Sequence, residues 1–337
     1  MQNINRTAIA ITLFLLTIFI GCGKEKTNGD PAPSDSSVVI PPPPNSNLPD
    51  IKGELVYHSY VNYGDESKMY IYDFSKKQLS CISCNWNIHD PMNAHFSPDG
   101  TKIVFMGQAV PNGKWDIYIW TIGSPGAPAN LTAGDRSRDE DPKFSPDGKS
   151  ICFKQTTSQS TGNLKIMDLN GTIINNVTNN TIESGVPYYL FNSAALIYAR
   201  GAGAASDIYK VNMNSSNNRA IEKENNLQEY YPIVVDSNTY LFSRWYSTSN
   251  HNDQVYLGYF LGTPSISLPF NTPNANYSDA YPCGTDYVFL SSTRAGTVGA
   301  YDLYIAHLKT GAIWTLTSFQ QNVNTSVNEL GACYWGD

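Results

Sequence analysis

Acidic residues recur at one position of a repeating pattern, just before a short segment that contains Pro or Ala. The six residues are Asp90, Asp139, Glu183, Glu229, Asp279 and Glu329. If the fold brings these carboxylates together in a concave site, they would attract a cation, an amine or a basic segment of a partner. Glu140 and Asp141 are additional acids, so the segment Arg138–Pro142 is where a metal such as calcium would bind, although it lacks the spacing of an EF-hand loop.

Cysteines offer a second kind of chemistry. Cys81 and Cys84 form a CxxC pair without a second CxxC or paired histidines, so the sequence does not predict a zinc site. The pair either remains reduced or forms a disulfide, which needs a turn because an extended strand would place the two residues about 10 Å apart. Cys152 lies within an apolar segment and is expected to be buried and inert. Pairing of Cys283 with Cys333, at corresponding places in neighbouring repeats, is less favoured.

The sequence lacks the motifs that are typical of catalytic sites. A G-x-S-x-G sequence is absent, which disfavours a serine peptidase, and the five histidines show no H-x-H or H-E-x-x-H spacing. His89 and His95 flank one expected strand and could face the same site as the acids. We therefore assign no catalytic residue, and an enzyme is the less favoured class. Four tryptophans in or near expected loops or outer strands could stack on sugar rings, which keeps a glycan partner open: Trp86, Trp115, Trp245 and Trp314.

The chain begins with a targeting segment. Arg6 precedes thirteen apolar residues, Ala8–Ile20, which is the length of a signal-peptide core and is short for a membrane span. The sequence Phe19-Ile20-Gly21-Cys22 resembles the lipobox of bacterial lipoproteins, and that resemblance implies a lipid on Cys22. The alternative is an ordinary secretory signal with a chance cysteine. We expect a signal peptide at residues 1–21 and a Pro-, Ser- and Asn-rich tether at 22–52 that attaches the chain to the envelope, in the outer membrane.

The rest of the chain, 53–337, repeats a three-strand pattern. Apolar segments centred on an aromatic residue recur every 44 to 48 residues, at Tyr57, Phe105, Phe153, Tyr198, Phe242 and Phe289. A second apolar segment follows each of them, and a third closes five of the six units. The sequence Ser-Pro-Asp-Gly, found at 97–100 and 145–148, is a β-turn signature. Consecutive apolar residues predict strands buried on both faces.

These features predict an all-β fold, a six-bladed β-propeller with four-stranded blades. The first unit lacks its first strand, and the last ten residues resemble one. We therefore expect residues 329–335 to pair within the first blade and close the ring. The net charge is −7 and no basic cluster is present, so nucleic acid is not expected as a partner.

The motif "FSPDGTKIVF…DIYIWTI…NLTAG" resembles the WD40-like (PD40) repeat of the TolB propeller domain over about 285 residues. TolB also has an N-terminal α/β domain, which 22–52 is too short to form, so the resemblance is to the propeller alone. The family's pattern implies that the six acids, near one mouth of the channel, bond backbone N–H groups of neighbouring blades, and we favour this interpretation. The expected function is a protein-binding envelope lipoprotein without a cofactor. The alternative is a polysaccharide-binding protein, or a degrading one similar to oligogalacturonate lyases.

Overall fold

The computed structural model describes residues 48–61, 66–134, 136–158 and 161–336. The expected signal peptide, Cys22 and most of the tether lie outside the described residues. Within the described ranges, no helix has the length and apolar character needed to cross a membrane. Pro49 is buried and Ile51 packs against a hydrophobic cluster, so the packed part of the chain already includes the last residues before Gly53.

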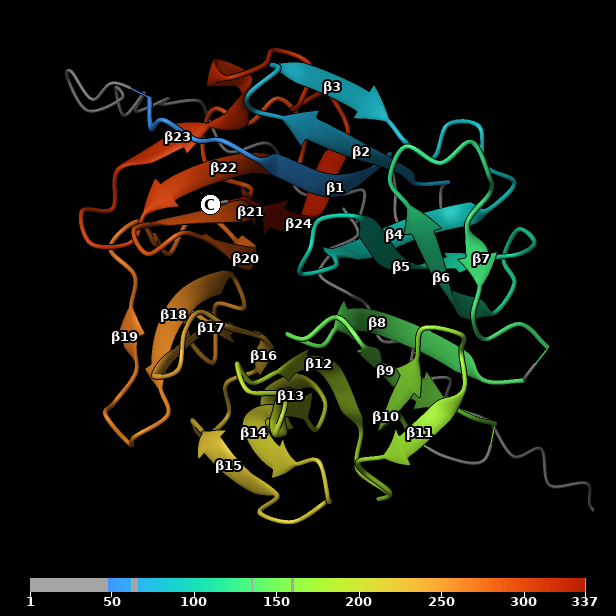
Figure 1. Cartoon of the computed structure of the whole chain (residues 1–337). Coiled ribbons are helices and arrows are strands. Elements are labelled where there is room, and N and C mark those ends of the chain that lie inside the picture. Colours follow the sequence, from blue (N-terminus) through green and yellow to red (C-terminus); the bar gives the residue numbers. More distant parts are fainter. Residues whose placement is uncertain (1–47, 62–65, 135, 159–160, 337) are drawn as a thin grey trace, which may run out of the picture. The chain divides into compact units, whose positions relative to one another are not determined.

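The described chain forms six four-stranded antiparallel sheets arranged around one axis, as Figure 1 shows. We number these blades along the chain and give their strands from the axis outwards. Blades 1 to 3 are β24 (Asn328–Trp335), β1 (Glu54–Tyr60), β2 (Lys68–Asp73), β3 (Gln78–Cys81); β4 (His89–Phe96), β5 (Lys102–Gln108), β6 (Trp115–Thr121), β7 (Ala129–Asn130); and β8 (Arg138–Phe144), β9 (Ser150–Thr156), β10 (Asn163–Asp168), β11 (Ile173–Asn176). Blades 4 to 6 are β12 (Ser184–Tyr189), β13 (Ala195–Arg200), β14 (Asp207–Asn212), β15 (Arg219–Glu222); β16 (Glu229–Val234), β17 (Thr239–Trp245), β18 (Asp253–Tyr259), β19 (Ile266–Ser267); and β20 (Tyr277–Cys283), β21 (Tyr287–Ser292), β22 (Asp302–His307), β23 (Ile313–Thr315).

The two ends of the described chain share blade 1. Strand β24 pairs antiparallel with β1, with Glu54 opposite Trp335 and Tyr60 opposite Asn328. The same strand contacts β20 of blade 6 and β4 of blade 2, so it closes the ring of innermost strands. The six-bladed fold and its closure by the C-terminal strand are therefore confirmed. The outer strand of blade 4, β15, was not predicted, because its sequence Arg-Ala-Ile-Glu carries two charges in four residues.

The Ser-Pro-Asp-Gly turns connect the first and second strands of blades 2 and 3. In the first of them, the N–H of Gly100 donates to the carbonyl oxygen of Ser97 over 2.9 Å, and Gly100 has a φ of +66°. The Asp99 carboxylate accepts hydrogen bonds from the Ser97 hydroxyl and the Thr101 N–H. Proline, aspartate and glycine thus have the separate roles expected in a tight turn, and the turn fixes the register of the two strands.

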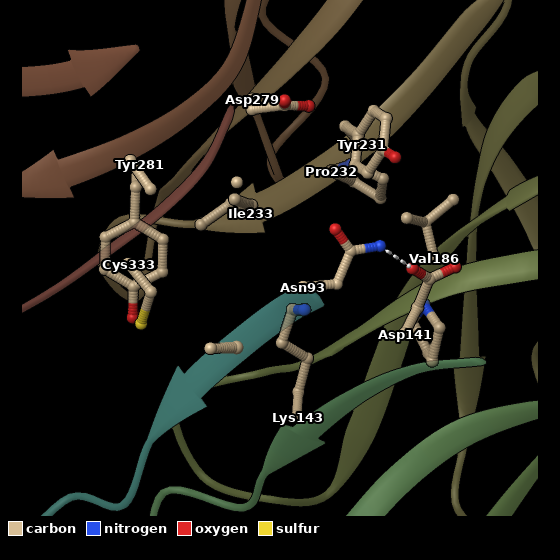
Figure 2. A pocket seen from close by; sticks show the side chains of 14 residues that line it. Asn93, Asp141, Lys143, Val186, Tyr231, Pro232, Ile233, Asp279, Tyr281 and Cys333 are labelled. Carbon is tan, nitrogen blue, oxygen red and sulfur yellow. Dashed lines mark hydrogen bonds between the residues drawn. The ribbon is translucent and has the colours of Figure 1, made fainter. Parts of the chain in front are cut away.

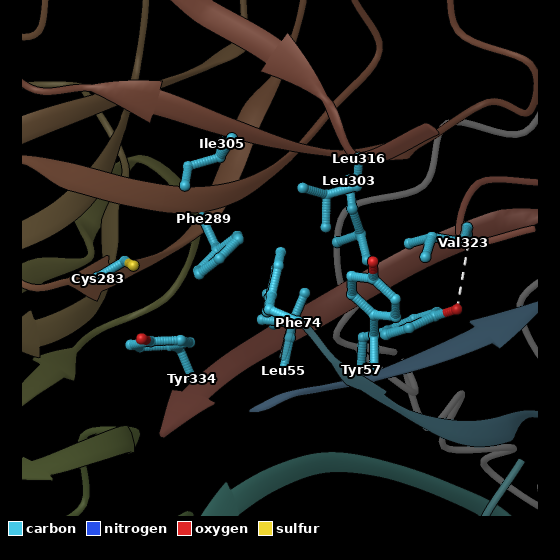
Figure 3. Packing of buried hydrophobic residues seen from close by; sticks show 12 residues of the cluster. Leu55, Tyr57, Phe74, Cys283, Phe289, Leu303, Ile305, Leu316, Val323 and Tyr334 are labelled. Atoms are coloured by element: carbon cyan, nitrogen blue, oxygen red, sulfur yellow. Dashed lines mark hydrogen bonds between the residues drawn. The ribbon is translucent and has the colours of Figure 1, made fainter. Parts of the chain in front are cut away.

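The core is divided into six hydrophobic clusters, one between each pair of neighbouring blades. Figure 3 shows the cluster between blades 6 and 1, where Leu55 and Phe74 meet Phe289 and Leu303. The aromatic residues that repeat along the sequence belong to these clusters, and all six are at most 2% exposed. Burying a side chain of that size contributes about 1.5–3 kcal/mol. Both faces of each blade are buried, which explains the consecutive apolar residues.

Candidate functional site

The innermost strands share a β-bulge at the same place. In each of them the pairing with the second strand shifts register, and the first residue of the bulge has a positive φ of 48–66°. Each of these residues is followed by Pro or Ala. The six residues are Asn93, Asp141, Val186, Tyr231, Asp279 and Gly331. A bulge redirects a side chain and is often found beside functional sites.

Two members of this set are unusual. Asn, Asp and Gly tolerate positive φ, whereas Val186 and Tyr231 adopt it against the preference of their side chains. Such strain persists only where the surrounding structure enforces it, and it gathers at binding and catalytic sites. All six innermost strands carry the bulge at this position, and in each of them the residue with positive φ lines the central channel.

The bulge residues line a cavity in the central channel, which we call the channel cup. About 40 Å³ of it is open to the centres of water molecules, so the cup has room for a few waters or one small group. Asn93 donates its amide to the Asp141 carboxylate over 2.8 Å, across the boundary between blades 2 and 3 (Figure 2). Asp279 lines the same cup from blade 6, and Lys143 lies in its wall. The cup thus holds two carboxylates and one ammonium group.

Both cup carboxylates are held in an unfavourable environment for charge. Asp141 and Asp279 are partly exposed, and both line the cup at the axis of the ring. Burial, followed by the charge of Glu140, raises the pKa of Asp141. Burial also raises the pKa of Asp279 to about 6, with smaller contributions from Asp253 and Asp141, while a backbone N–H of Gly331 opposes the shift. A cationic group that enters the cup would lower both pKa values and offset the free-energy cost of keeping these carboxylates ionised in a buried site.

A neutral cluster of aromatic side chains lies two residues beyond the bulges. The His95 Nε2 is 3.4 Å from the hydroxyls of both Tyr188 and Tyr281, and these hydroxyls are 3.3 Å apart. His95 Nδ1 accepts the N–H of Phe144, so the neutral ring carries its proton on Nε2. Burial and then Lys143 hold the pKa of His95 well below its usual value, and burial raises those of both tyrosines. None of the three is tuned for proton transfer near pH 7.

The six acids singled out from the sequence do not form one ring around the cup. Asp279 lines the cup because it is itself the bulge residue, directly before Ala280, and it also accepts the backbone N–H of Gly331 in the neighbouring blade 1. Asp90 accepts the N–H of Ser67 over 3.1 Å. Glu183 accepts that of Gly162 over 2.7 Å. Ser67 and Gly162 belong to the preceding blades, so Asp90 and Glu183 make the bond that the structural interpretation expects.

The other three acids are buried and bonded to side chains of their own blade or, for Glu329, of the segment directly before it. Asp139 accepts the Gln155 amide over 2.9 Å, and Glu229 accepts the Arg244 guanidinium over 2.8 Å. Glu329 accepts the hydroxyl of Thr325 over 2.6 Å and its backbone N–H over 3.2 Å, so it too binds a backbone donor of the segment that leads out of blade 6. Burial raises the pKa of Glu229 to about 7 and that of Glu329 to about 8. These acids therefore stabilise the blades through buried hydrogen bonds.

The cup offers oxygen ligands from Asp141, Asp279 and Asn93. Over the described ranges, no group of three or more His, Cys, Asp or Glu side chains is arranged to hold a metal ion. The segment Arg138–Pro142 divides its acids, because Glu140 pairs with Arg138 and Lys154 while Asp141 faces the cup. Asn93 and Asp141 could have been found from the sequence by the Ala or Pro that follows each bulge. The same Pro or Ala directly precedes Tyr188 and Tyr281, so this signal could have found them as well.

The remaining predicted residues are distributed over the ring. Cys81 and Cys84 form a disulfide with Cα atoms 5.6 Å apart, because the chain turns directly after β3. Three of the five cysteines in the described ranges have free, buried thiols: Cys152, Cys283 and Cys333. His89 lies 3.8 Å from Glu66 and does not line the cup. The tryptophans proposed for sugar stacking have other contacts: Trp86 stacks on Phe105, Trp115 is buried, Trp245 stacks on His251 and Trp314 packs near Tyr287.

Comparisons with known proteins agree with this architecture. Two curated relatives, both named Tol-Pal system protein TolB, come from Francisella tularensis subsp. tularensis and subsp. mediasiatica. Each is 26% identical over 166 residues, which is 49% of this chain. The chain covers only 37% of the length of these relatives. The crystal structure of TolB from Acinetobacter baumannii superposes with a TM-score of 0.65 at 16% identity, covering 84% of this chain and 66% of that one.

The fold is shared more widely. Hydrazine synthase of Kuenenia stuttgartiensis superposes with a TM-score of 0.67 at 12% identity, over 84% of this chain and 46% of that one, which shows likeness of fold alone. The family model described as TolB beta propeller domain, PD40, matches residues 49–232, which is more than half of the sequence. The chain therefore belongs to the TolB β-propeller domain family.

Proposed function

We propose that this chain is an envelope lipoprotein whose propeller binds a protein partner through the channel cup. Cys22 would carry the lipid, and the residues between Cys22 and the packed Pro49 would let the propeller reach its partner from the membrane surface. The curated relatives are named as proteins of the Tol-Pal system, which supports an envelope role. Because this chain covers only 37% of the length of these relatives, its partner has to be identified by experiment.

The observation that carries the proposal is the pair of carboxylates in the cup. Asp141 and Asp279 have raised pKa values in a concave site at the axis, although each accepts one hydrogen bond from the neighbouring blade, Asp141 from Asn93 and Asp279 from Gly331. Carboxylates with raised pKa values are often found at functional sites, where a bound molecule offsets the cost of their burial. A lysine, an arginine or an amino terminus on a protruding partner segment supplies the missing charge. The neutral cluster of His95, Tyr188 and Tyr281 then limits how deeply that segment enters.

The experiment uses the full chain in membranes with chemical cross-linking to capture the partner. Asp141→Asn and Asp279→Asn keep the shape of the cup and remove its negative charge, while Lys143 remains. We expect each to weaken the partner affinity about tenfold, the loss of one charge-assisted contact, while the melting temperature holds or rises. The matched control is Asp286→Asn, since the Asp286 side chain is 50% exposed and lies in the turn between β20 and β21. Full capture by the Asp141→Asn, Asp279→Asn double variant would refute the proposal.

The anchor is tested separately. Cys22→Ser is expected to move the protein from the membrane pellet to the soluble fraction, or to leave it unprocessed. Mass spectrometry of the mature protein should find a lipid-modified cysteine at its amino terminus. A mature terminus at any other residue would contradict the lipoprotein assignment and would leave the cup proposal intact.

A further inference from the structure

A second hollow lies where the last strand of the chain ends. It is a groove of about 410 Å³ between the end of β24, the start of β1 and the turn after β2. Trp335 lines it together with Lys52, Glu54, Asp73 and Lys76. A volume of this size falls within the range of about 300–1,000 Å³ that is usual for small-molecule sites. The groove lies apart from the channel cup, and the two share no lining residue.

Trp335 is a fixed aromatic platform in this groove. Its indole N–H donates to the carbonyl oxygen of Pro98 over 3.1 Å. Gly100 lies against one face of the ring, because a Cβ at that residue would overlap the three bonded atoms Cδ2, Cε2 and Cζ2. The hydrogen bond and the glycine set the position of the indole. Because Gly100 covers one face of the indole, the solvent-exposed part of the side chain is its other face and its outer edge.

The exposure of Trp335 is unusual for this protein. The residue is 39% exposed, whereas Trp115 and Trp120 are buried. Trp86 and Trp245 each stack on another ring. An apolar surface of this size that is held in place beside a groove is a common feature of binding sites.

The polar groups around the platform balance one another. Glu54 and Asp73 are direct cross-strand partners, and Lys76 donates to Asp73 over 2.7 Å. Lys52 supplies the second ammonium group, so two positive charges match two negative ones. The Glu54 carboxylate makes no hydrogen bond to another described residue, and burial followed by the charge of Asp73 raises its pKa. A strongly anionic or cationic ligand would meet groups of its own sign here.

We propose that this groove binds a neutral saccharide, with one sugar face on the open side of Trp335 and the hydroxyl groups toward Glu54, Asp73 and the two lysines. A sugar ring presents C–H groups on its face and hydroxyls at its edge, which matches an aromatic platform with a polar rim. Carboxylates accept and ammonium groups donate, so the rim serves both functions of a hydroxyl. This site goes beyond the protein-binding role proposed for the channel cup and does not depend on it.

The test follows the six indole N–H signals of the full chain by nuclear magnetic resonance, in micelles of a detergent without a sugar headgroup. Maltotriose, cellotriose and the neutral N,N′,N″-triacetylchitotriose are the probes. We expect at least one of them to shift the Trp335 signal in a saturable way, while the other five signals stay in place. Trp335→Ala should abolish sugar binding, as measured by calorimetry. Glu54→Gln, which breaks no hydrogen bond within the described chain, should weaken it threefold or more.

The controls separate a lost site from a lost fold. Trp245→Phe alters another tryptophan near the surface and should leave sugar affinity unchanged. If Trp335→Ala shifts all the other indole signals, the variant is misfolded and Glu54→Gln decides the question. A Trp335 signal unmoved by all three sugars, or sugar binding that survives both variants, would overturn the proposal. So would a peptide of residues 38–47 that shifts the Trp335 signal when the sugars do not, because the groove would then hold the chain's own proline-rich segment.

Discussion

Trp335 bonds the last strand of the chain to Pro98, whose carbonyl oxygen accepts the indole N–H over 3.1 Å in the first Ser-Pro-Asp-Gly turn. Its neighbour Tyr334 donates its hydroxyl to the carbonyl oxygen of Lys52, directly before β1. Two consecutive aromatic residues thus connect blade 1 to blade 2 and the end of the ring to its beginning. Closure of the propeller depends on this segment.

Removal of residues 328–337 should therefore abolish cooperative folding. The truncation deletes β24, leaves the edge of β1 unpaired and uncovers the cluster that contains Leu55 and Tyr57. We expect aggregation, or a broad thermal transition by circular dichroism in place of a sharp one. Removal of Asp337 alone is the control and should preserve the transition. A truncated chain that melts cooperatively at the temperature of the parent would show that β24 is dispensable.

Gly331 should be the least replaceable residue of the channel cup. It has a φ of +66°, and a Cβ there would stand 2.6 Å from the ring of His58. Gly331→Ala is therefore expected to lower the free energy of unfolding by about 1–3 kcal/mol, measured by urea denaturation. Gly262→Ala is the matched control, because Gly262 also has a positive φ, +80°, with no atom within 4 Å of the added methyl. Equal losses at the two sites would mean that contact with His58 contributes nothing.

The sequence predicted the blades well because each is specified by local signals. The turn Ser97–Gly100 and the buried aromatic Phe105 set the register of a strand pair without reference to the rest of the ring. The closing strand was predictable for a different reason, because blade 1 lacked an inner strand and the end of the chain supplied one. Strand β15 was missed because its pairing depends on its neighbours more than on its own composition.

The channel was harder to predict because it is built from a backbone irregularity. Counting back three residues from a proline placed Glu229 and Asp279 in one class. In β20, however, the residue after the bulge is Ala280 and not Pro282. In the structure Glu229 is buried against Arg244, whereas Asp279 faces the cup. The platform at Trp335 depends on a contact with Gly100, more than 230 residues away in the chain. No local pattern carries information over that separation.

The cysteines should react in a defined order. Cys152, Cys283 and Cys333 are at most 5% exposed, and burial raises the pKa of Cys283 to about 12, so their thiolates are scarce and shielded. Iodoacetamide should modify none of the described cysteines in the native protein. After mild reduction it should modify two, Cys81 and Cys84, and after unfolding all five. Modification of Cys152 before unfolding, detected by peptide mass spectrometry, would contradict the burial of blade 3.

Loss of the disulfide should be tolerated. The loop that it closes is four residues long, so its removal costs about 1–2 kcal/mol on the chain-entropy model. The Cys81→Ser, Cys84→Ser double variant should fold and melt cooperatively at a slightly lower temperature. The bond lies at the outer edge of blade 1, far from the innermost strands, so partner capture should be unchanged. A double variant that fails to fold would show that the bond sets the position of β3 during folding.

Glu329 should make the propeller less stable as the pH rises. Burial, opposed by the bonds from Thr325, raises its pKa from 4.5 to about 8 in the folded protein. Below about pH 4.5 both the folded and the unfolded chain hold the proton. Between pH 4.5 and 8 the folded protein retains a proton that the unfolded chain has lost, so the free energy of unfolding falls with rising pH. Glu329→Gln removes this dependence while it keeps an oxygen that can accept from Thr325.

The expected result is a difference that grows with pH. Near pH 4.5 the variant and the parent should melt together, and at pH 8.5 the variant should be more stable by roughly 1–3 kcal/mol. Taking the difference between the two proteins at each pH cancels the opposite trend from buried His58, whose pKa burial lowers to about 4. Glu224→Gln, at an exposed carboxyl, is the control for the loss of a charge. A variant less stable than the parent at pH 8.5 would mean that the ionised carboxylate of Glu329 is a required brace between β24 and the segment before it.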